Sequence, residues 1–486
     1  MRKFLKGEKV GIKLGPVDLL IDGVWTKSSQ RFPVSNPADN SVITEVADAT
    51  VQDAIASVDS SHEAFKTFSQ TSPRSRAEIL RKAFEIMTSE IDYCAELISL
   101  ENGKALKDAK AESVYAAEFF RWFSEEASRI TGDFRYAPNR DKTIITDHKP
   151  IGVAALITPW NFPAAMATRK IGPAIAAGCT MILKPASETP LTALWIADVM
   201  QRAGAPKGVV NVLTTSKSSE IISTIMKDQR VKTVSFTGST YVGKILLHQA
   251  ADSVMRCSME LGGNAPFLVL EGANVDSAVA GAMVAKMRNG GAACTAANRF
   301  YIHESVSKEF SQKFGAALAA LKVGPGVNQD TDLGAMVSIK ERDKIVELIE
   351  KAKAEGANVI STTKVPDSGA FLSPHVVTGV KHGSVLTREE IFGPVAPIVE
   401  FQKQSAAIEM ANDTEYGLIS YVYAKDGAEG IKVARQMDTG MVAINRGVAS
   451  DPAAPFGGMK ESGLGREGGF AGIHEFLEPQ YFAVDL

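Results

Sequence analysis

The chain has 486 residues, more than one ordinary hydrophobic core supports, so two or three domains are expected. Hydrophobic residues make up 45% and charged residues 22% of the sequence, which is ordinary for a globular protein. The 53 Lys and Arg residues against 56 Asp and Glu residues leave a formal net charge of −3. This balance excludes a basic footprint for nucleic acid and a strong acidic field, so any attraction of a substrate must be local.

Membrane attachment, secretion and metal binding are not expected. No stretch reaches the roughly 18 apolar residues that a membrane span requires, and Met1–Lys9 carries charge without the continuous apolar run of a secretory signal. The four cysteines lie far apart without metal-ligand spacing, which favours reduced thiols in a cytoplasm. Three of them, Cys94, Cys179 and Cys257, are expected to be buried as small hydrophobic residues.

The first third of the chain predicts a hairpin followed by helices. Val17–Trp25 alternates apolar and polar residues and contains Asp22-Gly23, a strong turn signal. Thr50 is placed to cap a helix, and Ser72-Pro73 opens another, because proline at the first helical position loses no needed donor. A longer helix is expected after Gly103. These helices are most simply packing layers.

The middle of the chain predicts a parallel sheet. Four buried-type strands are expected at Val153–Ile157, Met181–Leu183, Val209–Leu213 and Val231–Ser235, and helices should start near Pro190 and Ser239. This alternation favours βαβ units. Two other β-branched or aromatic runs, Thr143–Thr146 and Gln480–Val484, are typical of exposed ribbon strands.

Two segments carry side chains suited to catalysis. Cys294 lies among small residues after a glycine pair, within Arg288–Arg299. As a nucleophile it would need to be partly exposed and near a group that lowers its pKa; the alternative is a buried apolar cysteine in a loop. Glu260 follows an apolar run and precedes two glycines, in Met259–Asn264.

Four motifs occur in an order that resembles the aldehyde dehydrogenase superfamily: Pro159–Pro163, Met259–Asn264, the cysteine loop and Glu390–Val395. The resemblance runs from about Ile21 to the C-terminus and is greatest to bacterial succinate-semialdehyde dehydrogenases. It implies an α/β fold with a Rossmann-like cofactor domain (1–129 and 149–258), a catalytic α/β domain (259–467) and a small β bridging element (130–148 and 468–486). In the family this element pairs with a neighbouring subunit, so a homodimer or homotetramer is expected.

The resemblance also implies a mechanism and a role for each motif. Cys294 would attack the aldehyde carbon while the Asn161 side chain and the Cys294 backbone N–H hold the oxyanion. Hydride would leave to a nicotinamide, and Glu260 would activate the water that releases the acid. Glu390 would hold the nicotinamide ribose, and further cofactor contacts are expected from Thr158, Pro159, Trp160, Leu261 and Phe392.

Two elements bear on the rest of the cofactor. No Gly-x-Gly-x-x-Gly follows the first strand. Instead Gly238, Ser239 and Gly243 join a strand to a helix, where free amides favour phosphate; a tight turn without a ligand is the alternative. Lys184 should face the adenine ribose, and Ser187 replaces the glutamate of many NAD-preferring relatives. NADP is therefore expected, with NAD possible, although the adjacent Glu188 could swing inward.

Substrate charge is inferred from Arg169, Arg288 and Ser450, which match carboxylate-binding positions in succinate-semialdehyde dehydrogenases. The substrate implied is a small aldehyde with a distal carboxylate, either succinic or glutaric semialdehyde; general aldehydes are the alternative, with the arginines in internal salt bridges. One departure is Ala292, where many relatives have glutamine or glutamate. Competing classes are a cysteine hydrolase or acyltransferase, and a catalytically silent relative.

Overall fold

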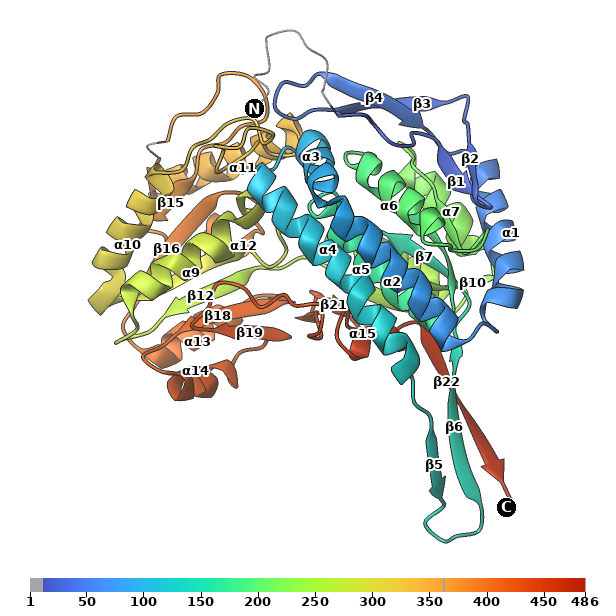
Figure 1. Ribbon diagram of the computed structural model, residues 1–486. Helices are drawn as coiled ribbons and strands as arrows, with labels where there is room; N and C mark the ends of the chain where they lie inside the picture. Colours follow the sequence, from blue (N-terminus) through green and yellow to red (C-terminus); the bar gives the residue numbers. More distant parts are fainter. Residues whose placement is uncertain (1–11, 362, 486) are drawn as a thin grey trace.

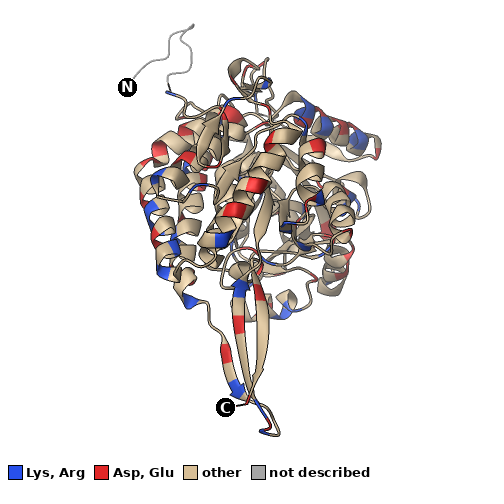
Figure 2. Cartoon of the chain, turned by 90° about the vertical axis from the view of Figure 1, so that its right-hand side faces the viewer, with Lys and Arg blue, Asp and Glu red and all other residues tan. Residues whose placement is uncertain are grey.

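Two large sheets, each covered by helices, and a projecting ribbon make up the molecule in the computed structural model, which describes residues 12–361 and 363–485 (Figure 1). The N-terminal segment that was expected not to be a secretory signal lies outside the described residues. Within these ranges no helix is both long enough and apolar enough to cross a membrane. Acidic and basic side chains are mixed over the face shown in Figure 2.

The first sheet has the strand order β2-β1-β9-β8-β7-β10-β11-β21. Its strands are β2 (Val24–Thr26), β1 (Leu19–Ile21), β9 (Val210–Val212), β8 (Thr180–Lys184), β7 (Val153–Ile157), β10 (Val231–Thr237), β11 (Arg256–Glu260) and β21 (Gly463–Leu464). The five strands from β9 to β11 are parallel, which confirms the predicted βαβ units. The strand order reverses its direction between β7 and β10, and open sheets of this kind bind ligands at such a switch point.

The second sheet has the order β14-β15-β16-β13-β12-β18-β19. Its strands are β14 (Asn358–Ile360), β15 (His375–Thr378), β16 (Val395–Phe401), β13 (Ala297–His303), β12 (Ala265–Val269), β18 (Ile419–Tyr423) and β19 (Met441–Ile444). All are parallel except β14. The two-stranded pairs are β3 (Arg31–Ser35) with β4 (Val42–Ala47), and β17 (Tyr416–Gly417) with β20 (Met459–Lys460).

The helices cover both sheets. They are α1 (Val51–Phe68), α2 (Pro73–Ser89), α3 (Ile91–Asn102), α4 (Leu106–Glu126), α5 (Pro163–Ala177), α6 (Pro190–Arg202), α7 (Ser218–Lys227), α8 (Thr240–Ala251), α9 (Val275–Met287), α10 (Glu304–Ala319), α11 (Ile339–Ala354), α12 (Val385–Arg388), α13 (Gln404–Asn412), α14 (Gly427–Ala434) and α15 (Ala471–His474). The sequence analysis missed α3, which ends where Gly103 adopts a left-handed φ of 90°.

The predicted local signals act as expected. Thr50 and Asp53 form a capping box at the start of α1, and Ser72 caps α2 just before its first residue, Pro73. In the hairpin, Ile21 pairs with Val24 across Asp22 and Gly23, both with positive φ.

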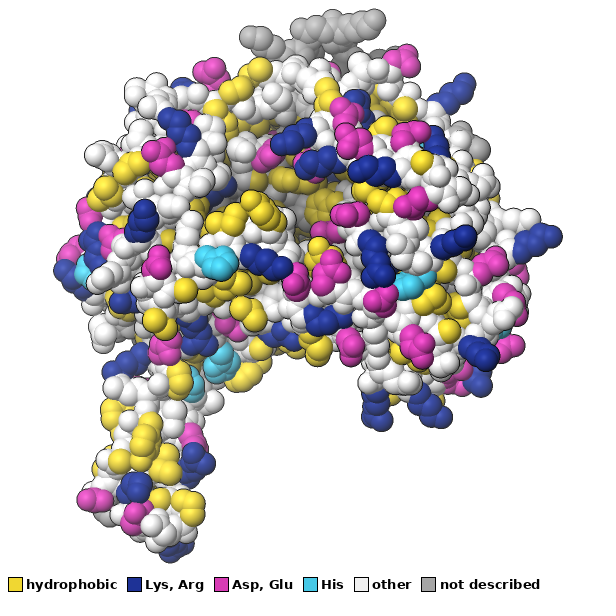
Figure 3. Space-filling view, turned by 180° about the vertical axis from the view of Figure 1, so that it is seen from behind, with side chains coloured by type: hydrophobic (Ala, Val, Ile, Leu, Met, Phe, Trp, Pro, Cys, Tyr) yellow, Lys and Arg dark blue, Asp and Glu magenta, His cyan; other side chains and the backbone are white. Residues whose placement is uncertain are grey.

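The ribbon extends from the body as an antiparallel sheet of β22 (Leu477–Val484), β6 (Thr143–Pro150) and β5 (Asp133–Tyr136) (Figures 1 and 3). It joins two segments far apart in the chain, and both had been predicted as ribbon strands. Large apolar side chains on it are exposed: Phe134, Tyr136, Tyr481 and Phe482. The boundaries of the three expected domains stay a prediction.

Candidate active site

A cavity of about 620 Å³ opens beyond the carboxyl ends of β7, β10 and β11. Nine of the residues predicted from the sequence line it: Pro159, Trp160, Asn161, Gly238, Ser239, Leu261, Cys294, Glu390 and Phe392. Helix α11 adds Glu341, Lys344, Glu347 and Lys351, which the sequence analysis missed because their spacing looks like an ordinary solvated face. Thr158, Lys184, Ser187, Gly243, Glu260, Arg169, Arg288 and Ser450 are not in its walls.

The loop that carries Cys294 depends on its glycines. Asn289, Gly290 and Gly291 have φ values of 55°, 60° and 78°, three consecutive residues in the left-handed region. A Cβ on Gly291 would lie 2.4 Å from the carbonyl oxygen of Gly393, so the loop passes too close for any other residue. This turn brings the nucleophile to the cavity wall directly after α9.

Cys294 is half-buried, and two arginines near it lower its pKa, as a nucleophile there would require, but the net shift of the pKa is upward. Burial raises the pKa of the thiol to about 12; Arg169 and Arg288 lower it, and Glu390 and Glu260 raise it further. Ala292 and Ala293, the two residues before Cys294, offer no polar side chain to stabilise a thiolate. In this structure the positive charges offset only part of the desolvation, and Cys294 is a thiol at neutral pH.

Asn161 and the Cys294 backbone lie in position to serve as hydrogen-bond donors. The Asn161 Nδ2 donates to the carbonyl oxygen of Ala292 at 3.2 Å, which ties it to the cysteine loop. The Cys294 N–H donates no hydrogen bond to any other described residue.

A buried ion pair on α4 holds Asn161 in place, and the sequence analysis missed it. Lys104 Nζ lies 2.5 Å from Glu112 Oε2 and donates to the Asn161 carbonyl oxygen at 2.6 Å. The other Glu112 oxygen accepts from the N–H groups of Ala164 and Ala165 at 2.9 and 3.3 Å. A carboxylate therefore caps the N-terminus of α5, where the helix dipole favours negative charge.

Asn289 connects the two loops from the other side. Its Nδ2 donates to the carbonyl oxygens of Asn161 and Ala292, each at 2.8 Å, and its backbone N–H donates to Asp108 Oδ2 at 3.1 Å. The Asn161 loop and the cysteine loop are thus fixed to each other and to α4. Only the glycine pair next to Asn289 had pointed to this turn in the sequence.

Glu260 ends β11 in a fully buried position. Neither of its carboxylate oxygens has a hydrogen-bond partner within the described residues. Burial raises its pKa well above the usual value, and Glu467 adds to the rise, while Arg169, Lys170 and Arg466 oppose it. Such a carboxyl group is a stronger base than an exposed one, which suits proton transfer near neutral pH.

Glu467 and Lys170 form a second buried pair beside Glu260. Lys170 Nζ contacts Glu467 Oε1 at 2.5 Å and Ser235 Oγ at 2.8 Å. The same Glu467 lies 3.4 Å from Arg169 Nη1. The sequence offered only the Ser462–Gly468 turn as a signal, so Glu467 was not singled out.

Glu390 lines the cavity and accepts from the Gly263 N–H at 3.1 Å. Burial raises its pKa to about 7, against the opposing effects of the Gly263 hydrogen bond and the charge of Lys286. Lys286 is fully buried, and burial lowers its pKa to about 7. The lack of water therefore destabilises the charged form of both Glu390 and Lys286.

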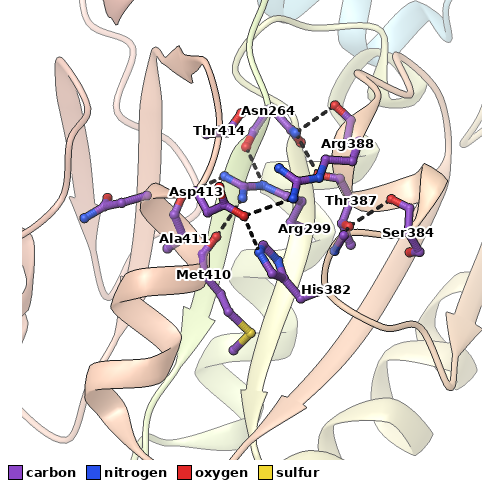
Figure 4. Close-up of polar contacts among 12 residues, drawn as sticks. Asn264, Arg299, His382, Ser384, Thr387, Arg388, Met410, Ala411, Asp413 and Thr414 are labelled. Atoms are coloured by element: carbon purple, nitrogen blue, oxygen red, sulfur yellow. Dashed lines mark hydrogen bonds and ion pairs between the residues drawn. The ribbon is translucent and has the colours of Figure 1, made fainter.

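The segment before Glu390 is anchored by side chains of the second sheet (Figure 4). Asn264 Nδ2 donates to the carbonyl oxygens of Thr387 and Arg388 at 3.0 and 3.3 Å, and Arg299 Nε donates to the Asn264 carbonyl oxygen at 2.9 Å. Asp413 contacts both His382 and Arg388, at 2.8 and 3.1 Å. These contacts fix the direction in which Glu390 faces the cavity.

The remaining predicted cofactor residues lie along β8 and α8. Ser239 caps α8, accepting from the Val242 N–H at 3.4 Å. Burial lowers the pKa of Lys184 to about 8, and Glu188 opposes this shift. Ser187 Oγ donates to Glu188 Oε2 at 3.1 Å, so the serine and the glutamate contact each other at the edge of the sheet.

The three predicted substrate residues have different surroundings. Arg169 is buried on α5 with its guanidinium carbon 4.3 Å from the Phe456 ring centroid, in addition to its contact with Glu467. Arg288 is half-buried, 3.5 Å from Thr295 Oγ1, and makes no ion pair with a described residue. No hydrogen bond joins Ser450 to either arginine; it lines a separate hollow with Arg446.

Asn161 and the Cys294 thiol line a cavity beyond the switch point of a parallel sheet, and the buried carboxyl group of Glu260 ends a strand of the same sheet. The model of the aldehyde dehydrogenase family matches residues 25–482. The chain belongs to this family, and it is an oxidoreductase that uses NAD(P).

Individual relatives narrow the comparison. The chain is 48% identical over 444 residues to a succinate-semialdehyde dehydrogenase from Paenarthrobacter nicotinovorans, covering 91% of this chain and 99% of the relative. It is 43% identical over 468 residues to a glutarate-semialdehyde dehydrogenase from Pseudomonas putida, covering 96% and 97%. The crystal structure of an NADP-dependent enzyme from E. coli matches with a TM-score of 0.95 at 41% identity, covering 98% of this chain and 100% of that chain.

Replacing Lys104 by methionine should loosen Asn161 and leave Glu112 buried without its counter-ion. Removing one partner of a buried pair costs about 3–5 kcal/mol, so both the thermal midpoint and kcat should fall clearly. Lys107→Met is the matched control, because Lys107 pairs with Asp332 at the surface and such pairs contribute about 0–1 kcal/mol. Thermal unfolding and steady-state kinetics measure both variants. Equal behaviour of the two would show that Asn161 keeps its place without Lys104.

Proposed function

We propose that this chain oxidises succinic semialdehyde to succinate with reduction of NADP, or less readily NAD, through a thiohemiacetal and a thioester on Cys294. The observation that carries the proposal is the position of Arg288, which lies 3.5 Å from the hydroxyl of Thr295, the residue after Cys294. The charges of Arg288 and Arg169 both act on the thiol, and Glu260 is buried. An aldehyde with a distal anion fits such a site better than a neutral aldehyde does.

The cavity residues fit a dinucleotide. A Cβ on Gly243, in the first turn of α8, would lie 2.5 Å from Leu261 Cδ2, so the glycine lets Leu261 pack closely against the start of this helix. Ser239 presents the N-terminus of a 12-residue helix, suited to phosphate, while Glu390 offers acceptors for ribose hydroxyls. When bound, the nicotinamide accepts the hydride. Thr158, Pro159, Trp160 and Phe392 would hold the rest of the group.

The first chemical step uses Cys294 and Asn161. The thiolate sulfur forms a bond to the aldehyde carbon, and the carbonyl electron pair moves to oxygen. The Asn161 amide and the Cys294 backbone N–H stabilise that oxyanion, and such a donor contributes about 2.7–4 kcal/mol in measured systems. Because the Cys294 pKa is raised to about 12, the thiol must lose its proton to a base before it attacks.

The second step uses Glu260. Its carboxylate takes a proton from water, the hydroxyl attacks the thioester carbon, and the C–S bond breaks to release the acid and the Cys294 thiolate. The pair of Glu467 and Lys170 lies next to Glu260 and sets its charge environment. Because its pKa is raised, the Glu260 carboxylate binds a proton strongly enough to act as the general base for this water.

Both arginines are candidates for the distal carboxylate. Arg288 has no described ion-pair partner, and Arg169, whose Nη1 lies 3.4 Å from Glu467, keeps its Nε without a described partner. Ser450 as a third contact rests on the resemblance alone. Glutaric semialdehyde is the second candidate substrate, supported by the relative from Pseudomonas putida. One methylene is worth only about 1–3 kcal/mol in a pocket.

The NADP preference rests on Ser187 and Lys184. A serine leaves room where a glutamate would repel a 2′-phosphate, and a phosphate beside Lys184 would restore the charge that burial weakens. Glu188 opposes this preference, since it contacts Ser187.

Assembly into a homodimer or homotetramer is supported by the ribbon, whose exposed aromatic side chains would be covered by a neighbouring subunit. Besides a neighbouring subunit, the only partner that we propose is the small aldehyde substrate. Free and widely separated thiols support a cytoplasmic location.

Glu260→Gln should slow turnover by about a hundredfold or more, because general-base catalysis contributes roughly that much. Acylation should continue, so intact-mass spectrometry after one turnover should find an acyl adduct on Cys294. Cys294→Ala should lose oxidation and keep cofactor binding, whereas Cys257→Ala, the control, should keep both. If acylation itself is slow and no acyl adduct forms on Cys294, Glu260 does not act in deacylation.

Succinic semialdehyde should exceed butanal in kcat/KM by roughly tenfold to a hundredfold, because a hydrogen bond to a charged group contributes about 1.5–3 kcal/mol. Arg288→Ala should narrow this gap by harming the charged substrate. The rate of oxidation of each aldehyde is measured from the absorbance of the reduced nicotinamide. Equal rates for the wild type would make the protein a general aldehyde dehydrogenase.

Ser187→Glu should reverse the cofactor preference from NADP to NAD, because two like charges then meet at the 2′-phosphate. Ser187→Gln is the matched control with the same size and no charge, and it should keep NADP preferred. The kcat/KM values for the two cofactors decide the point. Better use of NAD by the unchanged protein would contradict the assignment.

A further inference from the structure

Tyr115 on α4 is a polar group that the proposed mechanism does not use. Its hydroxyl is fully enclosed and makes no hydrogen bond within the described residues. Buried hydroxyl groups nearly always have a partner in native proteins, and an exception calls for an explanation. The carboxylate of a bound molecule is one such explanation, because it brings acceptors and no protons.

The phenol lies in the same aromatic enclosure as Arg169. The Tyr115 ring meets the Phe119 ring edge-on at a centroid distance of 4.9 Å. The Arg169 guanidinium carbon lies 6.0, 5.3 and 4.3 Å from the ring centroids of Tyr115, Phe119 and Phe456. Arg169 Nε is also buried without a partner. Two buried donors without a partner therefore belong to neighbouring side chains, whose guanidinium carbon and ring centroid lie 6.0 Å apart.

The groups around Tyr115 keep it a donor. Burial raises the pKa of the phenol, which Arg169 and Arg288 lower and Glu467 and Cys294 raise. The phenol is therefore neutral and holds its proton at physiological pH. The charges of Arg169 and Arg288 act on both Tyr115 and Cys294.

The frame behind these donors is rigid. Tyr115 and Glu112 both belong to α4, and Glu112 caps α5, the helix that carries Arg169. The two helices lie side by side (Figure 1). The donors are therefore placed by packed helices, and they need no loop movement to converge.

We propose that Tyr115 is a specificity-determining residue that donates its O–H to the distal carboxylate of the substrate, beside the Nε–H of Arg169. The inference rests on the proposed function, since it concerns the same substrate. The ligand class is a short aliphatic aldehyde that ends in a carboxylate. A neutral aldehyde of equal length would leave both donors unmatched.

The test removes one oxygen atom. Tyr115→Phe should lower kcat/KM for succinic semialdehyde by about tenfold or more, mainly through KM, and leave butanal within about twofold. The inhibition constant of the product succinate, measured against the aldehyde, should rise by a similar factor. Tyr93→Phe is the matched control, because its hydroxyl already donates to the Lys13 carbonyl oxygen at 3.3 Å.

The outcomes separate this inference from the proposed function. If the wild type does not prefer succinic semialdehyde over butanal, the proposed function is wrong and the inference goes with it. If the wild type has that preference and Tyr115→Phe keeps it, the inference alone is wrong. An equal loss for both aldehydes, with a shifted pH profile, would also overturn it, because Tyr115 would then act on Glu467. Thermal unfolding of Tyr115→Phe should match that of the wild type within a few degrees.

Discussion

The buried ion pair between Lys104 and Glu112 is the contact on which the geometry of the site depends. It connects the start of α4 to the Asn161 loop and to the first turn of α5. Two charges removed from water are tolerated only when all their hydrogen bonds are satisfied. Here the lysine also bonds a carbonyl oxygen and the glutamate also bonds two N–H groups. The pair therefore specifies one position for the oxyanion donor, and Asn289 transmits that position to the cysteine loop.

Desolvation governs the rest of the chemistry. Glu260 and Glu390 have raised pKa values, and Lys184 and Lys286 have lowered ones, because each is enclosed by apolar residues. The protonation states of these groups change readily when a charged group binds next to them. A phosphate, a carboxylate or a developing oxyanion would then supply the missing partner, so the site is organised for anions although the net charge of the chain is −3.

Local elements were predictable from local signals. The hairpin at Asp22-Gly23, the caps at Thr50 and Ser72 and the parallel strands from β7 to β10 all lie where the sequence indicated. Helix α3 was missed, because it carries neither a proline nor a side-chain cap at its start. The raised pKa of Cys294 could not be predicted, because it depends on how completely the loop is enclosed, and enclosure is not a local property.

The sequence by itself determined the fold class and pointed to Cys294, Glu260 and the turn from Gly238 to Gly243 as candidate site residues, because each lies in a short motif whose residues are neighbours in the chain. Only the tertiary structure decided which charges meet. Lys170 and Glu467 are separated by 297 positions, and Lys104 reaches Asn161 across 57. Tyr115 looked like one more aromatic residue on an apolar helix face until its unpaired hydroxyl was found beside Arg169. Pairing and desolvation depend on distances through space, and those distances are set only when the helices pack.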